Sequence, residues 1–370
     1  MLYPSICCVP EVFAAVKPPS DAVAGKKTEK PMSRNINVLV TIPFEEKFVN
    51  LLRAVSSQLE VSVTKARSTD DIPAEVWRQV DVLYTGSILP TLEQAPNLKW
   101  IQFHFAGLDR VANAPILQQA GVVTTSLSGA HVPQMGEYVL MMLLSLGHKL
   151  PEMLASKEKS DWVRDRFERF SPVELRGSTV GIVGYGSIGR EVARLLQPFD
   201  VTVLATKWNA MQPQDTGFTQ VGMGDPNGDF PRRIYPFQAL KSMIQECDFL
   251  VVAVPLTPET RGLLGADELA AMKPGSFLVD VSRGGVIDHI ALMRALKDKK
   301  IAGAALDVFP EEPLPKDNPL WKMPNVIISP HISGNSPAYD ARAAALFAEN
   351  LQRFLTEKPL LNQFDLVRGY

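Results

Sequence analysis

The chain has 370 residues, which is more than one ordinary hydrophobic core holds, and this length predicts two domains. Its formal net charge of -2 argues against nucleic acid or an anionic membrane as a partner. The three cysteines form no C-x-x-C pair, and no run approaches about 18 apolar residues. These features exclude a disulfide framework, a zinc cluster and a membrane span, and they fit a reducing, cytoplasmic compartment.

The pattern of the chain changes at residue 36. Residues 1–35 are rich in proline and lysine and lack periodicity, so we expect a disordered extension, with Met32 as an alternative start. Residues 44–60 then carry one apolar helical face. Short apolar runs predict strands at 36–42, 80–86, 98–105 and 121–126. This alternation predicts a first α/β unit over residues 36–128.

A second α/β unit follows a strongly apolar helix that we expect at residues 133–153. Apolar runs predict strands at 179–183, 201–206, 249–254, 276–281, 301–308 and 325–329, with helices at 187–197 and 288–300. Strands that alternate with helices predict a doubly wound parallel sheet. Residues 209–236, rich in Gly, Pro and Asp, interrupt this alternation and are interpreted as a surface insertion.

The last predicted helix, residues 337–355, is expected to return to the first unit. The predicted domains are therefore a discontinuous one, residues 36–128 and 329–370, and an inserted one, residues 129–328.

A glycine-rich stretch, VGIVGYGSIGR, has the spacing G-x-G-x-x-G at Gly184, Gly186 and Gly189. Glycines also cluster in ordinary tight turns, so the spacing alone says little. Here the stretch directly follows a predicted strand and opens a predicted helix, as a dinucleotide site requires. Gly184 permits the turn, Gly186 admits a diphosphate, and Gly189 lets the helix pack closely. A dinucleotide-binding site is the better interpretation.

Polar residues follow three predicted strands. Arg283 comes after residues 276–281, Asp307 closes residues 301–308 with Glu311 and Glu312 just beyond, and His331 follows residues 325–329. Taken singly, each has an ordinary explanation: a surface ion pair, a solvated acidic pair, or a histidine that caps a core strand. Ligands of open parallel sheets bind at the carboxyl ends of strands. Together, these residues suggest carboxylate binding and proton transfer beside a dinucleotide.

Five segments together resemble the D-isomer-specific 2-hydroxyacid dehydrogenases, which include glyoxylate/hydroxypyruvate reductases and phosphoglycerate dehydrogenases. They are VGYGSIGRE, VAVPLTPETRGLL, VDVSRGGVID, ALDVFPEEPLP and ISPHISG, and the resemblance covers about residues 35–370. It implies two Rossmann-like parallel-sheet domains: a substrate domain (36–128 and 329–370) and a dinucleotide-binding domain (129–328). It also implies a catalytic trio of Arg283, Glu312 and His331.

The resemblance implies further binding residues. Substrate would contact Arg283, His331 and the loop FAGLDRV, through Ala106 and Gly107. The cofactor NAD(P) would contact Gly184, Gly186, Ser187, Ile188, Gly189, Pro255, Thr260 and Asp307. The helix at 133–150 matches the region through which these enzymes form homodimers, and we expect a homodimer. The alternative is that its apolar surplus is buried within its own chain.

The implied reaction is hydride transfer between a nicotinamide and the α-carbon of a 2-oxo or 2-hydroxy acid, with no metal. His331 would move the proton, oriented by Glu312, and Arg283 would bind the carboxylate. Two alternatives stay open. A formate dehydrogenase has glutamine where Glu312 stands, and a dinucleotide-sensing corepressor would keep the same trio while acting as an interaction module.

Two stretches of the sequence bear on which dinucleotide and which 2-oxo acid would bind. NAD-selective sites carry an acid about 20 residues after the glycine loop, yet here the predicted strand ends in Thr206, Lys207, Trp208 and Asn209. Asp200 and Asp215 lie outside this position. Lys207, helped by the Thr206 hydroxyl, would favour NADP, unless Lys207 points into solvent. The aromatic stretch WIQFHFAG hints at a partly apolar substrate pocket, or simply at core.

Overall fold

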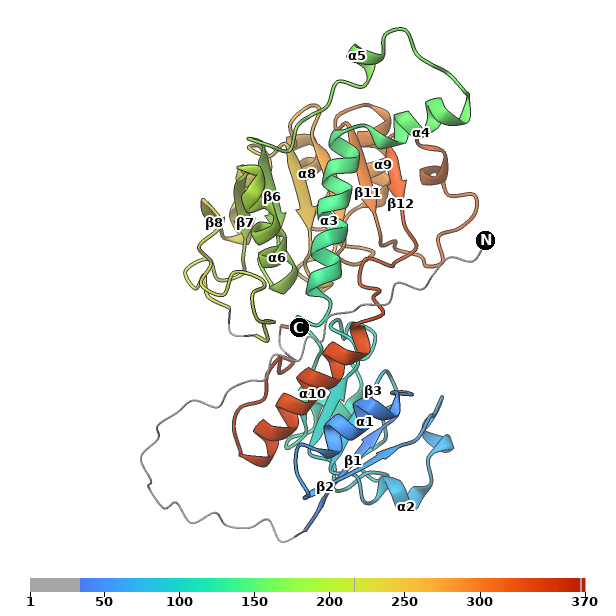
Figure 1. Cartoon of the computed structure of the whole chain (residues 1–370), viewed down its shortest axis with the longest axis vertical. Helices are drawn as coiled ribbons and strands as arrows, with labels where there is room; N and C mark the ends of the chain where they lie inside the picture. The colour runs from blue at the N-terminus through green and yellow to red at the C-terminus, as the bar shows by residue number, and fades with distance from the viewer. Residues whose placement is uncertain (1–33, 216, 367, 370) are drawn as a thin grey trace, which may run out of the picture. The chain divides into compact units, whose positions relative to one another are not determined.

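The computed structural model describes residues 34–215, 217–366, 368 and 369. Residues 1–33 of the expected N-terminal extension lie outside this description. Among the described residues, two sheets form, and every pairing between named strands is parallel. The first has the order β2-β1-β3-β4-β5, and the second β12-β11-β10-β9-β6-β7-β8 (Figure 1). These sheets confirm the predicted α/β fold class.

The strands of both sheets are short and mostly buried. In the first sheet they are β1 (Ile36–Val40), β2 (Leu59–Val63), β3 (Val82–Thr85), β4 (Trp100–Phe103) and β5 (Val123–Thr125). In the second they are β6 (Thr179–Val183), β7 (Thr202–Thr206), β8 (Arg233–Tyr235), β9 (Phe249–Val252), β10 (Phe277–Asp280), β11 (Gly303–Leu306) and β12 (Val326–Ile328).

Helices cover both sheets, and 3-10 turns connect several of them. They are α1 (Glu46–Arg53), α2 (Ala74–Trp77), α3 (Val132–Gly147), α4 (Leu150–Glu158), α5 (Arg166–Arg169), α6 (Ser187–Leu196), α7 (Leu240–Ile244), α8 (Ala266–Ala271), α9 (His289–Lys297) and α10 (Tyr339–Leu355). None is long and apolar enough to cross a membrane, a finding that covers only the described residues.

The first sheet is packed by helices from opposite ends of the described chain. Phe347 and Leu351 of α10 share one core with Val49 and Leu52 of α1 and with β1. Figure 1 shows α10, in red, alongside α1, in blue. The last helix therefore returns to the first sheet, as the sequence predicts.

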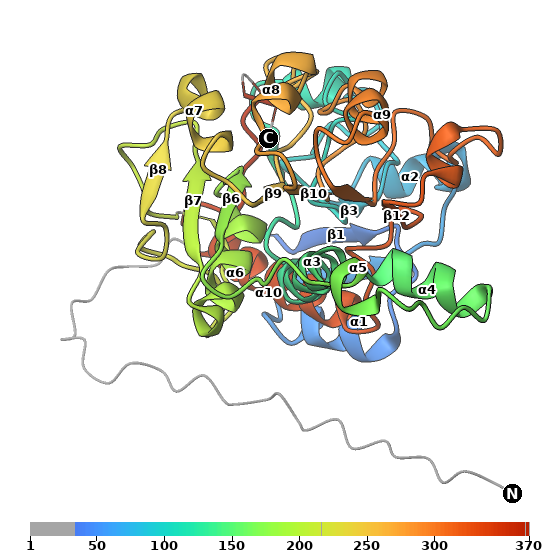
Figure 2. The same ribbon diagram turned by 90° about the horizontal axis from the view of Figure 1, so that it is seen from above.

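The second sheet is covered on both faces. Helices α3 and α6 pack on one face through residues such as Val139, Leu143 and Val192. Helices α7, α8 and α9 pack on the other through residues such as Met243 and Leu292 (Figure 2). Asp288 caps α9, because its side chain accepts the N–H groups of Ile290 and Ala291.

Two expectations about secondary structure are corrected. The predicted helix at 44–60 ends at Arg53, and Leu59 begins β2, where Leu59 and Val61 alternate with exposed residues in the period of a strand. The segment 209–236 is more than a surface insertion, because Arg233–Tyr235 pairs with β7 as the edge strand β8.

The apolar surplus of the helix predicted at 133–153 is largely buried within its own chain. Val139 and Leu143 of α3 are fully buried against the second sheet, and Met142 and Leu146 nearly so. Only Met141 of its large apolar residues is markedly exposed. The composition of this helix therefore gives no evidence for a dimer.

Candidate active site

A tight glycine turn joins β6 to α6. Gly184 has a φ of +102°, and a Cβ there would lie 2.7 Å from the carbonyl oxygen of Ala253. A Cβ on Gly189 would lie 2.4 Å from the carbonyl oxygen of Gly184. A Cβ on Gly186 would meet no described atom within 4 Å. The turn therefore leaves an open approach to the first turn of α6, at Ser187, which is what a diphosphate needs.

The end of β7 supports the glycine turn. Thr206 is fully buried, its Oγ1 accepts the N–H of Gly184 at 3.2 Å, and its carbonyl accepts the N–H of Tyr185. The Thr206 hydroxyl therefore braces the turn as an acceptor, and its own proton is not used in this hydrogen bond. Lys207 Nζ donates to the carbonyl oxygens of Gln212 and Gln214. Burial and the charge of Arg190 lower the pKa of Lys207.

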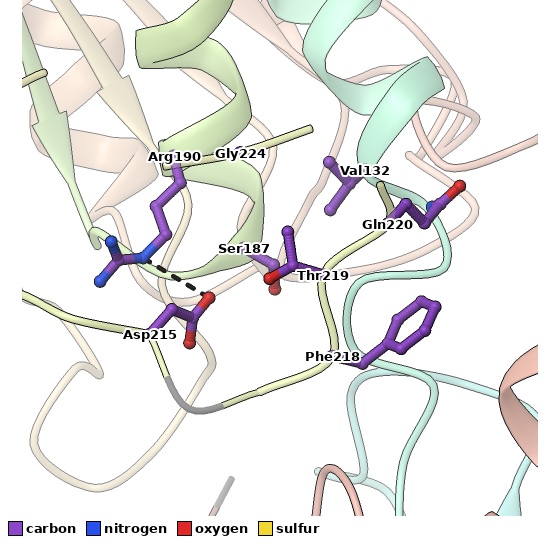
Figure 3. A pocket seen from close by; sticks show the side chains of 8 residues that line it. All are labelled: Val132, Ser187, Arg190, Asp215, Phe218, Thr219, Gln220 and Gly224. Carbon is purple, nitrogen blue, oxygen red and sulfur yellow. Dashed lines mark ion pairs between the residues drawn. The ribbon is translucent and has the colours of Figure 1, made fainter. Parts of the chain in front are cut away.

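Residues 209–215 and 217–232 fold onto the start of α6. Arg190, almost fully buried in α6, donates to the carbonyl oxygens of Pro213 and Asp225, and its Nε lies 3.5 Å from a carboxylate oxygen of Asp215. Figure 3 shows Arg190 and Asp215 beside Ser187, with Thr219 close by. Asp215, which the sequence places outside the position of a ribose-binding acid, therefore lines a small pocket at the helix start.

The loop that follows β11 and the loop that follows β12 bring Glu312 to His331. Glu312 Oε2 lies 2.9 Å from His331 Nδ1, and its Oε1 accepts the N–H of Phe309 at 3.0 Å. The carboxylate can only accept, so Nδ1 carries a proton and Nε2 is left for chemistry. The His331 side chain is 41% exposed, and its φ is +54°. The pair has the arrangement of an oriented acid–base histidine.

Arg283, after β10, lies against the predicted substrate loop. A Cβ on Gly107 would come within 2.1 Å of Arg283 Nη2, so only glycine leaves room for the guanidinium as it stands. Arg283 Nε lies 3.3 Å from Asp109 Oδ1, and Nη1 donates to the carbonyl oxygen of Ser282. These contacts join the loop after β4 in the first sheet to the loop after β10 in the second.

The remaining predicted cofactor residues are also at strand ends. Thr260 Oγ1 donates to the carbonyl oxygen of Pro255 at 2.6 Å and also accepts the N–H of Thr257, which closes the loop after β9. Asp307 is fully buried, and both of its carboxylate oxygens accept hydrogen bonds from the chain itself. Pro255 and Thr260 are thus hydrogen-bonded to each other. The carboxylate of Asp307 accepts its hydrogen bonds from other residues of the chain.

Two polar residues near Arg283 were missed from the sequence. Asp109 belongs to the loop FAGLDRV but has no distinguishing spacing. His131 stacks on Tyr339 with ring centroids 4.7 Å apart. Burial, with the charge of Arg283 next, lowers the pKa of His131 to about 4, so this histidine is neutral at physiological pH. A histidine directly before a long predicted helix was the only available signal.

The chain resembles known proteins in both sequence and structure. Residues 140–333, more than half of the chain, match the family model described as D-isomer specific 2-hydroxyacid dehydrogenase, NAD binding domain. A glyoxylate reductase of Thermofilum pendens is 33% identical over 261 residues, which is 70% of this chain and 73% of that protein. The chain belongs to this family.

Other members of the family differ in length from this one. A D-3-phosphoglycerate dehydrogenase of Methanocaldococcus jannaschii is 30% identical over 324 residues, and these cover 86% of this chain but only 57% of that protein. A second, from Archaeoglobus fulgidus, is matched over 59% of its length. The chain thus spans less than three fifths of these two curated relatives.

Solved structures of the dehydrogenase family share the fold over nearly the whole chain. A member from Xanthobacter autotrophicus, in complex with NADPH and MES, has a TM-score of 0.74 and 27% identity, covering 91% of this chain and 100% of that one. An NADPH-dependent glyoxylate/hydroxypyruvate reductase from Sinorhizobium meliloti, in complex with NADP and sulfate, has a TM-score of 0.70 and 26% identity, with the same coverage.

The match to the family's NAD binding domain spans the glycine turn and all three strand-end residues Arg283, Glu312 and His331. The open approach over Gly186 fits a dinucleotide diphosphate at the start of α6. No cluster of three His, Cys, Asp or Glu side chains suited to a metal ion occurs in the described ranges.

Proposed function

We propose that this dehydrogenase reduces 2-oxo acids to 2-hydroxy acids with NAD(P)H, as a glyoxylate/hydroxypyruvate reductase-like enzyme. The bound dinucleotide would supply the hydride to the carbonyl carbon. The observation that carries the proposal is the hydrogen-bonded pair of Glu312 and His331, 2.9 Å apart, at the same edge of the sheet as Arg283. Such a pair can deliver the proton that the carbonyl oxygen takes up as the hydride arrives.

His331 would act as the acid in reduction and as the base in oxidation. Its Nδ1–H donates to Glu312, so the proton that moves is the one on Nε2. The hydrogen bond to Glu312 fixes the orientation of the ring, so that Nε2 faces away from the carboxylate. A formate dehydrogenase transfers no such proton, and the presence of Glu312 therefore supports a 2-oxo acid substrate.

Arg283 would bind the carboxylate of the 2-oxo acid together with backbone N–H groups of Ala106 and Gly107. Its planar fork suits a carboxylate, and its contact with Gly107 supports a binding site that includes that loop. Residues 36–128 with 329–370 would form the substrate domain, and residues 129–328 the dinucleotide-binding domain. Asp109 would share the guanidinium with the incoming carboxylate.

Turnover with NADPH should be measured on glyoxylate, hydroxypyruvate, pyruvate and bulkier 2-oxo acids. His331→Ala should lower kcat about 10²–10⁴-fold on the best substrate, as expected when a general acid is lost. His148→Ala, which removes an exposed histidine at the end of α3, is the control. No turnover on any 2-oxo acid would favour a corepressor-like role, and wild-type kcat in His331→Ala would refute the mechanism.

We further propose a preference for NADPH. Lys207 and Arg190 put two positive charges beside the end of β7, against the one negative charge of Asp215. Two relatives of known structure were solved with NADP or NADPH. Lys207 would exchange carbonyl partners for the 2′-phosphate, a gain of about 1–2 kcal/mol, or roughly 5- to 30-fold in affinity. Because Lys207 must give up its hydrogen bonds to carbonyl oxygens, the preference for NADPH over NADH should be limited.

The ratio of kcat/KM for NADPH and NADH tests this preference at saturating 2-oxo acid. The dissociation constants of 2′,5′-ADP and 5′-AMP isolate the contribution of the 2′-phosphate. Lys207→Asp should reverse both ratios through a repulsive charge, whereas the exposed Lys241→Asp should leave them unchanged. A wild-type enzyme that favours NADH tenfold would contradict the assignment.

A homodimer is the remaining proposal, and it rests on exposed side chains rather than on the composition of α3. Leu154 of α4 is 53% exposed, Trp162 84% and Phe167 of α5 81%. These three large apolar side chains are exposed within 14 residues of one segment, and exposed apolar surface of this kind is favoured at protein interfaces. A second copy of the chain would cover them. Light scattering should give twice the monomer mass, and Trp162→Glu should reduce it; a monomer at micromolar concentration would exclude the dimer.

A further inference from the structure

His331 has an unusual backbone conformation for a residue with a side chain. Its φ of +54° lies in the left-handed region, which is disfavoured for residues other than glycine and persists only when the surroundings enforce it. The His331 N–H also donates to the carbonyl oxygen of Ser329 at 3.1 Å. The contacts that hold residues 329–333 therefore decide where the imidazole points.

The buried carboxylate of Asp307 holds this loop. Its Oδ1 accepts the N–H of Ile332 at 2.9 Å, and its Oδ2 accepts the N–H of Ser333 at 2.9 Å. These are the two residues directly after His331. A carboxylate that accepts two successive N–H groups fixes the direction of the chain there, and such hydrogen bonds are stronger than neutral ones.

A hydroxyl relay connects Asp307 to α3. Ser329 Oγ lies 2.6 Å from Asp307 Oδ1, and Tyr138 OH lies 2.5 Å from Ser329 Oγ. Asp307 accepts every bond it makes, so the single proton of the Ser329 hydroxyl goes to Asp307 and Tyr138 must donate to Ser329. Burial raises the pKa of Tyr138 to about 12, so its hydroxyl remains a donor at neutral pH.

The neighbouring carboxyl group of Asp280 has a less complete set of donors than Asp307. Asp280 Oδ1 accepts the N–H and the hydroxyl of Ser282, and its buried Oδ2 has no partner among the described residues. Asp307 has three donors on two oxygens. Of the two carboxyl groups, that of Asp307 is therefore the one tied to the chain through both of its oxygens.

We propose that Tyr138 and Ser329 are positioning residues of the enzyme, which hold the Asp307 carboxylate so that it fixes the left-handed backbone of His331. Neither side chain needs to touch substrate or cofactor for this role. The inference rests on the proposed function for its effect on turnover, but the effect on the loop itself is independent of any reaction.

Hydrogen exchange followed by mass spectrometry tests the loop without turnover. In Ser329→Ala the amides of Ile332 and Ser333 should exchange about 10-fold faster or more, as expected when a hydrogen bond to a charged group is lost. Ser329→Thr, which keeps a hydroxyl, should restore slow exchange. Tyr235→Phe, which removes a tyrosine hydroxyl bonded to Glu246, is the matched control and should leave these amides unchanged. Unchanged exchange in Ser329→Ala would overturn the proposal.

Turnover then separates positioning from general stability. Ser329→Ala and Tyr138→Phe should each lower kcat about 10-fold, with KM for the 2-oxo acid within about twofold and with little change in Tm. Because Tyr138 acts through Ser329, the double variant should be no slower than Ser329→Ala. Losses that multiply, or a kcat no lower than in Tyr235→Phe, would contradict the relay. An inactive wild-type protein that still shows the exchange effect would refute the proposed function alone.

Discussion

The carboxyl group of Glu312 is ionised more readily than usual in the candidate active site. Burial raises the pKa of its carboxyl, but the hydrogen bonds from His331 and from the N–H of Phe309 outweigh burial, and that pKa is lower than usual. The positive charges of His331 and Arg110 act in the same direction. Glu312 is therefore ionised throughout the pH range in which a histidine ordinarily titrates.

Glu312→Gln should lower kcat for 2-oxo acid reduction. The amide keeps a hydrogen-bond acceptor for His331 Nδ1 but removes the carboxylate charge, and the weaker neutral hydrogen bond orients the imidazole less firmly. Glu311→Gln, an exposed neighbour, is the matched control. The measurement is kcat between pH 5 and pH 9 at saturating substrate, and superimposable profiles would contradict the role of Glu312.

Single residues of the site could be predicted when a motif fixed their place at a strand end. Arg283, Glu312 and His331 were predicted in this way, and the structure brings Glu312 within 2.9 Å of His331. Asp109 could not be predicted, because its partner lies 174 residues away and depends on how the two sheets bring their loops together. The role of Ser329 was hidden for the same reason, because a hydroxyl has no pattern until its neighbours are known.

At the scale of elements, the segment 209–232 is organised around the buried carboxylate of Asp225. Its Oδ1 accepts the N–H groups of Gly228 and Asp229, and its Oδ2 accepts the N–H of Phe230 and the hydroxyl of Tyr185. Burial raises the pKa of Asp225, but these donors outweigh burial and lower it overall. The segment is thereby attached to the glycine turn, since Tyr185 lies within that turn.

Asp225→Ala should detach the segment and destabilise the protein. Loss of several hydrogen bonds to one carboxylate should lower the free energy of unfolding by about 2–4 kcal/mol. Limited proteolysis should then cut faster within residues 209–232. Asp229→Ala, which removes an exposed carboxylate four residues along, should change neither quantity. Equal stability and equal cleavage in the two variants would show that Asp225 does not hold the segment.

Elements were predictable where one periodicity ran undisturbed, as in the buried strands β6, β9 and β10 and in α10. The prediction failed where two elements share apolar residues. Leu59 fits the apolar face of a helix from residue 44 as well as the start of β2, and only pairing with β1 decides between them. Residues 233–235 were missed because a three-residue edge strand is too short to show a period.

At the scale of the whole molecule, the proposed site is built from loops of different strands at the carboxyl edges of two sheets. Arg283 touches Gly107 across this arrangement, and Tyr138 of α3 reaches the loop of His331 through Ser329. Under the proposed function, the contacts that hold these loops would serve both stability and catalysis. Burying carboxyl groups at these strand ends has an energetic cost that appears in the dependence of stability on pH.

Asp280 should carry a large part of that dependence. Burial raises the pKa of its carboxyl to about 7, and the hydrogen bonds from Ser282 only partly oppose this. The usual value in an unfolded chain is about 3.9. Folding therefore favours the protonated form, and the contribution of Asp280 to stability is fully present below about pH 4 and is lost as pH rises through 7.

Asp280→Asn should remove this loss, because the amide cannot ionise while its oxygen still accepts from Ser282. Urea unfolding of the two proteins at pH 5, 6, 7 and 8 measures the effect. Between pH 5 and pH 8 the difference in unfolding free energy should move in favour of the variant by about 2–3 kcal/mol, at about 1.4 kcal/mol for each pH unit up to 7. Asp317→Asn, at an exposed position, should give no such change. A difference in unfolding free energy between the two proteins that is the same at every pH would contradict this expectation. That result would mean that folding does not change the protonation of Asp280 between pH 5 and pH 8.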